Sequence, residues 1–106
     1  MAGTRPEIIK LAPVYLALHS SIAFEPFFIS TGQHKELLED ALFPFNMKLD
    51  GNFQIMNKAN SLDQVMSLTF AKSSQLFAQE NPAAVIVQGD TSTAASVAIC
   101  AYNNKI

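Results

Sequence analysis

Residues 83–96, AAVIVQGDTSTAAS, join an unbroken apolar run to a glycine and a group of hydroxyl side chains. The β-branched residues 85–87 give this run the continuous apolarity of a strand that is covered on both faces of a sheet. The small residues from Ala94 onward favour a helix, so Gly89, Asp90 and Thr91 would form the turn between the two elements. The stretch therefore predicts a strand, turn and helix unit of an α/β fold.

Two other segments predict a turn of the same kind. In GTRPE, residues 3–7, Thr4 and Glu7 have the spacing of a capping box and Pro6 falls in the first turn, so we expect a helix that begins at Arg5. In FEPFFIS, residues 24–30, aromatic residues predict a strand that runs into STGQH, residues 30–34. Because parallel strands end at one edge of a sheet, where such folds bind ligands, the three turns predict a shared binding site.

The middle of the chain adds a strand and a long helix. Residues 53–56, FQIM, are a candidate for a short strand, while Ser61 and Gln64 form a second capping box. Apolar periodicity after that box predicts a helix that ends before Asn81 and Pro82. Its expected buried face comprises Leu62, Val65, Met66, Thr69, Phe70, Ser73, Leu76 and Phe77.

Composition limits the classes of protein. The 106 residues are 49% hydrophobic and 15% charged, which is typical of one small globular domain or a piece of a larger one. The net charge is -2, and the charged residues stand singly along the sequence, so we expect neither a nucleic acid nor a membrane as partner. The single cysteine, Cys100, lies in an apolar run and should be buried, and no metal site is expected. The sequence shows no secretory signal, so the expected location is cytoplasmic.

Three charged residues stand at the predicted turns. Arg5 and Lys10 lie near a helix N-terminus and together suit an anion, but five residues turn a helix by about 140°, so spacing alone does not place them on one face. A solvated surface pair is the alternative. Asp90 could cap the following helix, bind a ligand hydroxyl or accept a proton, and spacing leaves all three open.

In this order and at these separations, GTRPEIIKLAP (3–13), TGQHKELL (31–38) and QGDTSTAAS (88–96) resemble the non-hydrolysing UDP-N-acetylglucosamine 2-epimerases. The resemblance runs over essentially the whole chain. It implies a Rossmann-like parallel sheet with flanking helices, part of the first domain of a two-domain GT-B fold. Residues 1–106 would be a partial N-terminal domain, with the first strand missing before Gly3 and the second domain outside the chain.

The resemblance also implies a reaction and its residues. Family members interconvert UDP-N-acetylglucosamine and UDP-N-acetylmannosamine without a cofactor, by elimination and re-addition of UDP, for polysaccharide precursors. By motif match, Arg5 and Lys10 would bind substrate, and Asp90 would be both substrate-binding and catalytic. Gln33 and Glu36 match positions near a second, activating UDP-N-acetylglucosamine. The full-length protein would be a homodimer.

Three alternatives stay open at this point. The chain could be the sugar-nucleotide-binding half of a GT-B glycosyltransferase or of a hydrolysing epimerase. It could instead be a non-catalytic dimerisation module that uses the helix at residues 62–79. Within the epimerases, the substrate could be a modified sugar such as a diacetamido uronic acid. Because the family's catalytic glutamates would lie outside this chain, we expect the isolated chain to be inactive. Because the first, central strand would be missing, we also expect it to be of low stability.

Overall fold

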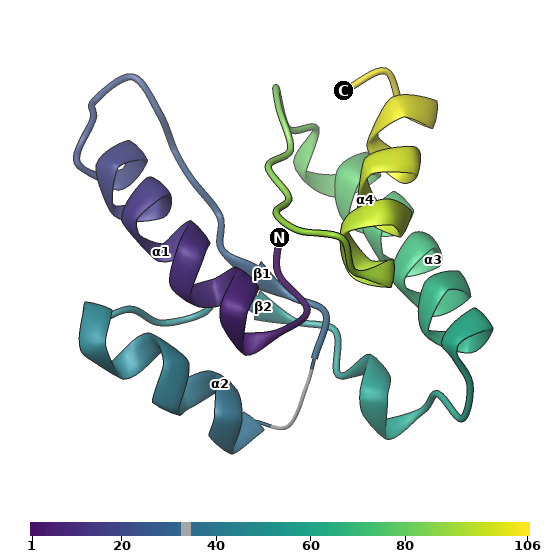
Figure 1. Cartoon of the computed structure of the whole chain (residues 1–106). Helices are drawn as coiled ribbons and strands as arrows, with labels where there is room; N and C mark the ends of the chain where they lie inside the picture. The colour runs from purple at the N-terminus through teal and green to yellow at the C-terminus, as the bar shows by residue number, and fades with distance from the viewer. Residues whose placement is uncertain (33–34) are drawn as a thin grey trace.

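The computed structural model describes residues 1–32 and 35–106 and places the helices in two groups (Figure 1). Helices α1 and α2 lie on one side of a small sheet, and α3 and α4 pack against each other on the other side. The elements are α1 (Arg5–His19), β1 (Ile29–Ser30), α2 (Lys35–Leu42), β2 (Gly51–Asn52), α3 (Leu62–Glu80) and α4 (Ser92–Asn103), with 3-10 turns at Phe43–Phe45 and Ile55–Asn57.

The small sheet is parallel, as predicted. β1 pairs with β2 in a register that sets Ile29 opposite Gly51 and Ser30 opposite Asn52. On its other side β1 meets Ala2 through a parallel bridge: the Ala2 N–H donates to the Ile29 carbonyl at 3.0 Å, and the Thr31 N–H donates to the Ala2 carbonyl at 2.9 Å. The segment at Ala2 and strand β1 therefore run in the same direction, and the turns that follow them lie at the same edge of the sheet.

The predicted strand at residues 83–88 does not form. In the described part of the chain no segment pairs along it, although the Met1 ammonium donates to the Ile86 carbonyl at 2.7 Å. A strand is a ladder of hydrogen bonds between neighbours, so apolar composition cannot produce one without a partner. The prediction was also wrong over residues 24–28: the Phe28 carbonyl already accepts from the Asp50 N–H at 3.0 Å, but the strand itself begins only at Ile29.

The predicted strand at residues 53–56 is also wrong. The Phe53 N–H still donates to the Ser30 carbonyl at 2.9 Å, which continues the pairing for one residue beyond β2. The backbone then turns at Gln54, which has a φ of +52°, and enters the 3-10 turn at Ile55. A left-handed residue cannot continue a strand, so the local backbone ends it there.

The predicted helix boundaries are confirmed. α1 begins at Arg5, and the Glu7 carboxylate accepts from the Thr4 N–H at 2.9 Å, as expected for a capping box. Ser61 caps α3 by accepting from the Gln64 N–H at 3.2 Å, and Asn81 ends α3 in the left-handed conformation. The predicted buried face of α3 fails at Leu62, which is 64% exposed in the first turn.

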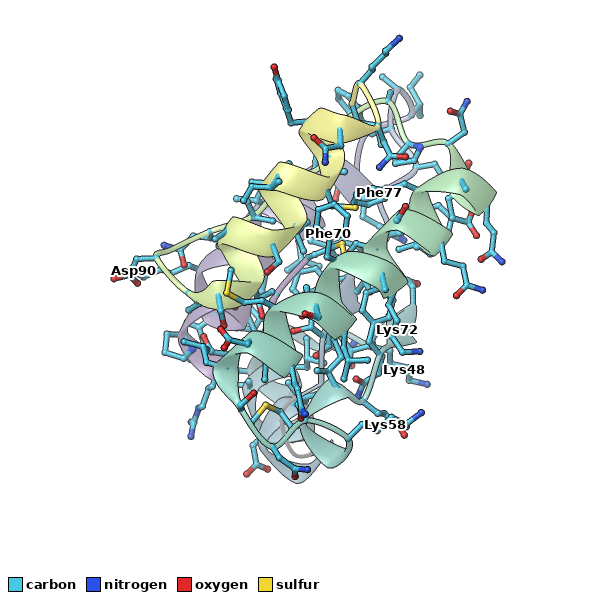
Figure 2. All side chains as sticks on the ribbon, turned by 90° about the vertical axis from the view of Figure 1, so that its right-hand side faces the viewer. Lys48, Lys58, Phe70, Lys72, Phe77 and Asp90 are labelled. Atoms are coloured by element: carbon cyan, nitrogen blue, oxygen red, sulfur yellow. The ribbon has the colours of Figure 1, made fainter. Side chains whose placement is uncertain are left out.

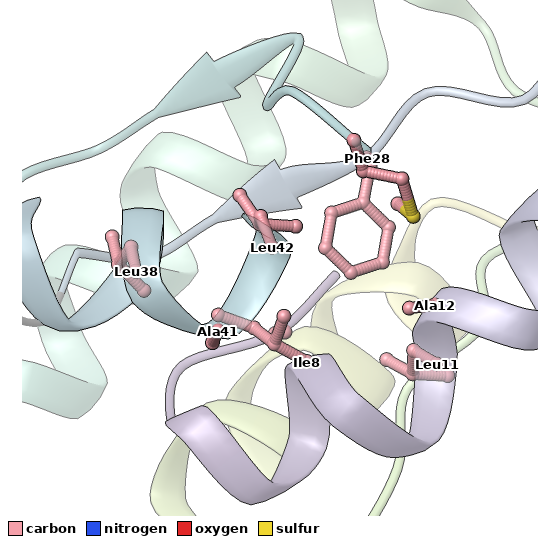
Figure 3. Close-up of a cluster of buried hydrophobic side chains, with 9 residues drawn as sticks. Ile8, Leu11, Ala12, Phe28, Leu38, Ala41 and Leu42 are labelled. Atoms are coloured by element: carbon pink, nitrogen blue, oxygen red, sulfur yellow. The ribbon is translucent and has the colours of Figure 1, made fainter. Parts of the chain in front are cut away.

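Two apolar clusters hold the chain together. One joins α1 and α2 to β1 (Figure 3), with Ala2, Ile8, Leu11, Ala12, Phe28, Leu38, Ala41, Leu42 and Met47. The other lies between α3 and α4, with Phe77, Val97, Cys100 and Ala101. Cys100 is buried as predicted, and this burial raises the pKa of its thiol. Among the described residues, no helix has the length and apolar character that a membrane crossing requires.

The amino terminus should make the stability of this chain depend on pH. Burial lowers the pKa of the Met1 ammonium from 8.0 to about 6, against the Glu7 carboxylate, which favours the charged form. Between pH 6 and 8 the unfolded chain therefore binds more protons than the folded chain, so the free energy of unfolding should rise with pH by roughly 2 kcal/mol. Urea denaturation at several pH values measures this rise in the free energy of unfolding. An N-acetylated chain should lose this rise, and an unchanged pH dependence after acetylation would contradict the assignment.

Candidate functional site

The three predicted turns meet at one edge of the sheet. Thr31 Oγ1, which follows β1, lies 3.0 Å from Thr93 Oγ1 in the first turn of α4, and both side chains are buried. Thr91, the N-cap of α4, donates its hydroxyl hydrogen to the carboxylate of Glu7 in the first turn of α1. Residues 3–7, 30–32 and 88–93 are therefore joined directly by side chains, which confirms that these turns share one edge.

Gly3 is the place where the backbone lies closest to the side chains of this junction. A Cβ at position 3 would lie 2.8 Å from Thr93 Cβ and 3.0 Å from Thr31 Oγ1, and closer still to Thr93 Oγ1. Real Cβ atoms essentially never approach other atoms within 3.0 Å. Because the neighbouring side chains are short and buried, they cannot swing aside. Glycine is the residue that lets the backbone before α1 lie against both threonines.

Glu7 is a buried carboxylate shared between two of the turns. It is 3% exposed, and its Oε2 accepts from the backbone N–H groups of Gly3 and Thr4 while its Oε1 accepts from Thr91. The capping-box spacing predicted the contact with Thr4 alone. The contact with Thr91 was missed, because spacing along one helix says nothing about a partner far along the chain.

The predicted site residues are exposed around this junction. Arg5 lies two residues before Glu7 in the first turn of α1, and Asp90 directly precedes Thr91, so the backbone at both positions lies close to the Glu7–Thr91 contact. Figure 2 shows Asp90 in the turn before α4, projecting from the molecule. Lys10 is exposed further along α1. The Thr91 hydroxyl caps α4 by accepting from the Ala94 N–H at 3.2 Å, so the capping role considered for Asp90 belongs to its neighbour.

The two predicted effector residues are not placed by the structure. Gln33 lies outside the described residues. The backbone of Glu36 belongs to α2, but its side chain lies outside the described part of the structure. Gly32, just before them, is buried with a φ of +99°, and its backbone lies against Gln54 in the turn that follows β2. The turn after β2 therefore adjoins the same edge.

The edge suits an anionic ligand. The N-termini of α1 and α4 both lie here, and each presents the positive end of a helix dipole. On α1 the capping box and Pro6 already take up most of the first backbone N–H positions, so the N–H groups at the start of α4 are the more available ones. Arg5 adds a full positive charge, and Asp90 adds a carboxylate that can accept or donate a proton. Within residues 1–32 and 35–106 no group of three or more metal-ligating side chains could hold a metal ion.

An apolar cleft lies elsewhere on the molecule. It runs between α1, residues 23–29 and residues 82–86, and its walls include Leu11, Phe28 and Val85. Arg5, Lys10 and Asp90 do not line it. The polar edge and the apolar cleft are therefore distinct surfaces.

Comparison with known proteins decides the family. The family model described as UDP-N-acetylglucosamine 2-epimerase matches residues 16–106. The chain belongs to the UDP-N-acetylglucosamine 2-epimerase family. It is 33% identical over 104 residues to the UDP-N-acetylglucosamine 2-epimerase of Bacillus subtilis, an alignment that covers 98% of this chain and 27% of that epimerase. The epimerase of Neisseria meningitidis is 34% identical, with 98% of this chain and 28% of the relative covered.

Solved epimerase structures have the same fold. The UDP-GlcNAc 2-epimerase from Neisseria meningitidis bound to UDP-GlcNAc superposes with a TM-score of 0.94 at 33% identity, over 99% of this chain and 28% of that one. The Methanocaldococcus jannaschii epimerase in complex with UDP-GlcNAc and UDP gives 0.86 at 30% identity, over 99% and 29%. The Rossmann-like GT-B fold class is thus confirmed. The chain spans a little over a quarter of the length of these epimerases.

Proposed function

We propose that the chain supplies one wall of the active site of an enzyme that interconverts UDP-N-acetylglucosamine and UDP-N-acetylmannosamine. The observation that carries the proposal is the junction of the three turns through Glu7, Thr91, Thr31 and Thr93. It sets exposed Arg5 and Asp90 beside the N-termini of two helices. The relatives named as UDP-N-acetylglucosamine 2-epimerases support the choice of reaction.

The proposed reaction is an elimination followed by an addition. The C2–H bond and the bond from C1 to the diphosphate oxygen break, which leaves a double bond between C1 and C2 of a 2-acetamidoglucal, free UDP and one proton on the enzyme. Protonation of C2 from the opposite face and return of UDP to C1 then invert C2. No oxidant or reductant is consumed, so the reaction needs an acid, a base and groups that stabilise the departing diphosphate.

The residues at the edge fit these tasks. Asp90 is a carboxylate on a turn that is tied to α1, and we assign it proton transfer at the sugar. Arg5 and Lys10 are exposed cations near the α1 N-terminus, and we assign them the diphosphate. We further propose that Gln33 and Glu36 contact a second, activating UDP-N-acetylglucosamine, that the full-length protein is a cytoplasmic homodimer, and that its product feeds surface polysaccharide precursors.

A single exposed carboxylate cannot both deprotonate one face of C2 and protonate the other. We therefore propose that the isolated chain does not turn over substrate, and the test uses a hybrid in which residues 1–106 replace the matching segment of the Bacillus subtilis relative. The hybrid should epimerise UDP-N-acetylglucosamine and, in D₂O, place deuterium at C2 of the product. A folded hybrid that releases free sugar, or that forms product without deuterium at C2, would contradict the proposal.

Arg5 should contribute to affinity through its charge. In the isolated chain, Arg5→Ala should weaken UDP-N-acetylglucosamine binding about tenfold, because a charged hydrogen bond to phosphate contributes about 1.5–3 kcal/mol. Isothermal titration measures the change. Lys48→Ala is the matched control, because Lys48 is also an exposed cation but lies apart from Asp90 (Figure 2). Equal losses in the two variants would show that overall charge, and not this edge, attracts the ligand.

A further inference from the structure

Glu7 does more than cap the helix that contains it. Its carboxylate spans two turns that are 84 residues apart in the sequence, and it is 3% exposed. We propose that Glu7 is a positioning residue that holds the turn at residues 89–90 against the first turn of α1, and so sets the place of Asp90. This inference rests on the proposed function, because Asp90 is the group that is positioned.

The two carboxylate oxygens of Glu7 have different partners, which supports this role. Capping α1 requires one oxygen, and Oε2 performs it by accepting from Gly3 and Thr4. The other oxygen, Oε1, accepts from the Thr91 hydroxyl. A glutamate that only capped α1 would leave Oε1 to water, whereas here a partly buried hydrogen bond joins Oε1 to the turn before α4.

Two hydrogen bonds hold the Thr91 hydroxyl in one orientation and so link α1 to α4. Its hydroxyl has one hydrogen, which goes to Glu7, while the same oxygen accepts from the Ala94 N–H at 3.2 Å. The hydroxyl is therefore held by α1 on one side and by α4 on the other. Asp90 is attached directly to this residue, so the bond between Thr91 and Glu7 restricts where the Asp90 backbone can lie relative to α1.

Gly89, on the other side of Asp90, faces the same glutamate. A Cβ built at Gly89 would lie 3.8 Å from both Cγ and Oε1 of Glu7, so the α hydrogen that takes this direction points toward the glutamate side chain. Of the two neighbours of Asp90, Thr91 thus bonds to Glu7 and Gly89 faces it, while Asp90 itself stays exposed. Because Glu7 is shielded from water, these contacts are not exchanged for solvent, and the arrangement leaves the Asp90 carboxylate free for a ligand.

Nuclear magnetic resonance on the 106-residue chain tests the positioning directly. In the wild type we expect a nuclear Overhauser effect between the Gly89 α protons and the Glu7 γ protons. Thr91→Val removes the hydroxyl and should abolish it, while Thr91→Ser keeps the hydroxyl and should retain it. Ser61→Ala is the matched control, because it removes a helix cap of the same geometry from α3, and it should leave the effect intact.

Ligand affinity supplies the functional measurement. At temperatures where each variant is folded, Thr91→Val should weaken UDP-N-acetylglucosamine binding about fivefold, because it breaks the bond to Glu7 together with the α4 cap. Thr91→Ser, which keeps both bonds, and Ser61→Ala, which removes only a helix cap, should stay within twofold. The double variant Glu7→Ala with Thr91→Val should bind no more weakly than the weaker single variant, because each single substitution already breaks the Glu7–Thr91 bond.

Two results separate this inference from the proposed function. If folded Thr91→Val keeps the Gly89–Glu7 signal, Glu7 is a cap only, and the positioning role is overturned whatever the affinity. If the wild type does not bind UDP-N-acetylglucosamine, the proposed function fails, and the Gly89–Glu7 signal in the valine and serine variants still decides whether Glu7 holds the turn.

Discussion

Alanine at position 3 should lower the free energy of unfolding by about 2–4 kcal/mol. The added Cβ would lie 2.8 Å from Thr93 Cβ and 3.0 Å from Thr31 Oγ1, and both threonines are buried. Overpacking of a tight site costs about 1–3 kcal/mol, and separating the two threonines adds the loss of their hydrogen bond, about 1 kcal/mol. Urea denaturation followed by circular dichroism measures the change. Domains of this size have only about 5–15 kcal/mol of stability, so a large loss is expected to be visible.

Gly51→Ala is the control for this substitution. A Cβ at Gly51 would meet the Ile29 Cδ1 atom at 3.0 Å, the end of a flexible side chain that can shift. The loss there should be under about 1 kcal/mol. Equal stability of the two alanine variants would mean that the turns do not meet as tightly as the structure describes.

Replacement of Asp90 by asparagine should reduce turnover of the hybrid epimerase by a factor of about 10²–10⁴, the usual contribution of a general acid or base. Asparagine keeps the size and polarity of the side chain but cannot take or give a proton at C2. Because Asp90 is exposed and Thr91 provides the α4 cap, the stability of the variant should stay within about 0.5 kcal/mol of the parent.

Separate measurement of substrate binding and of turnover makes the Asp90→Asn result specific to proton transfer. Turnover should fall while the KM for UDP-N-acetylglucosamine changes little, because the loss falls on the transition state. Asp63→Asn, in the exposed first turn of α3, removes the same charge elsewhere and should leave turnover unchanged. An Asp90→Asn hybrid that retains more than a tenth of the parent activity would remove Asp90 from the proton-transfer step.

Local signals predicted the helices well. Thr4 with Glu7 and Ser61 with Gln64 each describe groups within one helical turn, so the spacing predicts their hydrogen bonds. Before α4 the spacing offered Asp90 as a cap, whereas the structure gives that role to Thr91. The meeting of three turns at one edge could also be predicted, because parallel α/β units place the carboxyl ends of strands together.

Features that depend on distant partners could not be predicted. Residues 83–88 have strand composition but lack a pairing neighbour in the described chain, and nothing in the run itself reports that. The bond between Glu7 and Thr91 joins residues 84 positions apart, and the need for glycine at position 3 comes from Thr31 and Thr93. The physics of these contacts is ordinary, but the partners are brought together only by the fold.

Amide chemical shifts during a titration with UDP-N-acetylglucosamine test whether the three joined turns form a sugar-nucleotide site. We expect saturable shifts at residues 3–7 and 88–93, at the N-termini of α1 and α4, with the signals of the α3 C-terminal half unchanged. Shifts confined to the apolar cleft around Leu11 and Val85, or no shift at either helix N-terminus, would contradict this expectation.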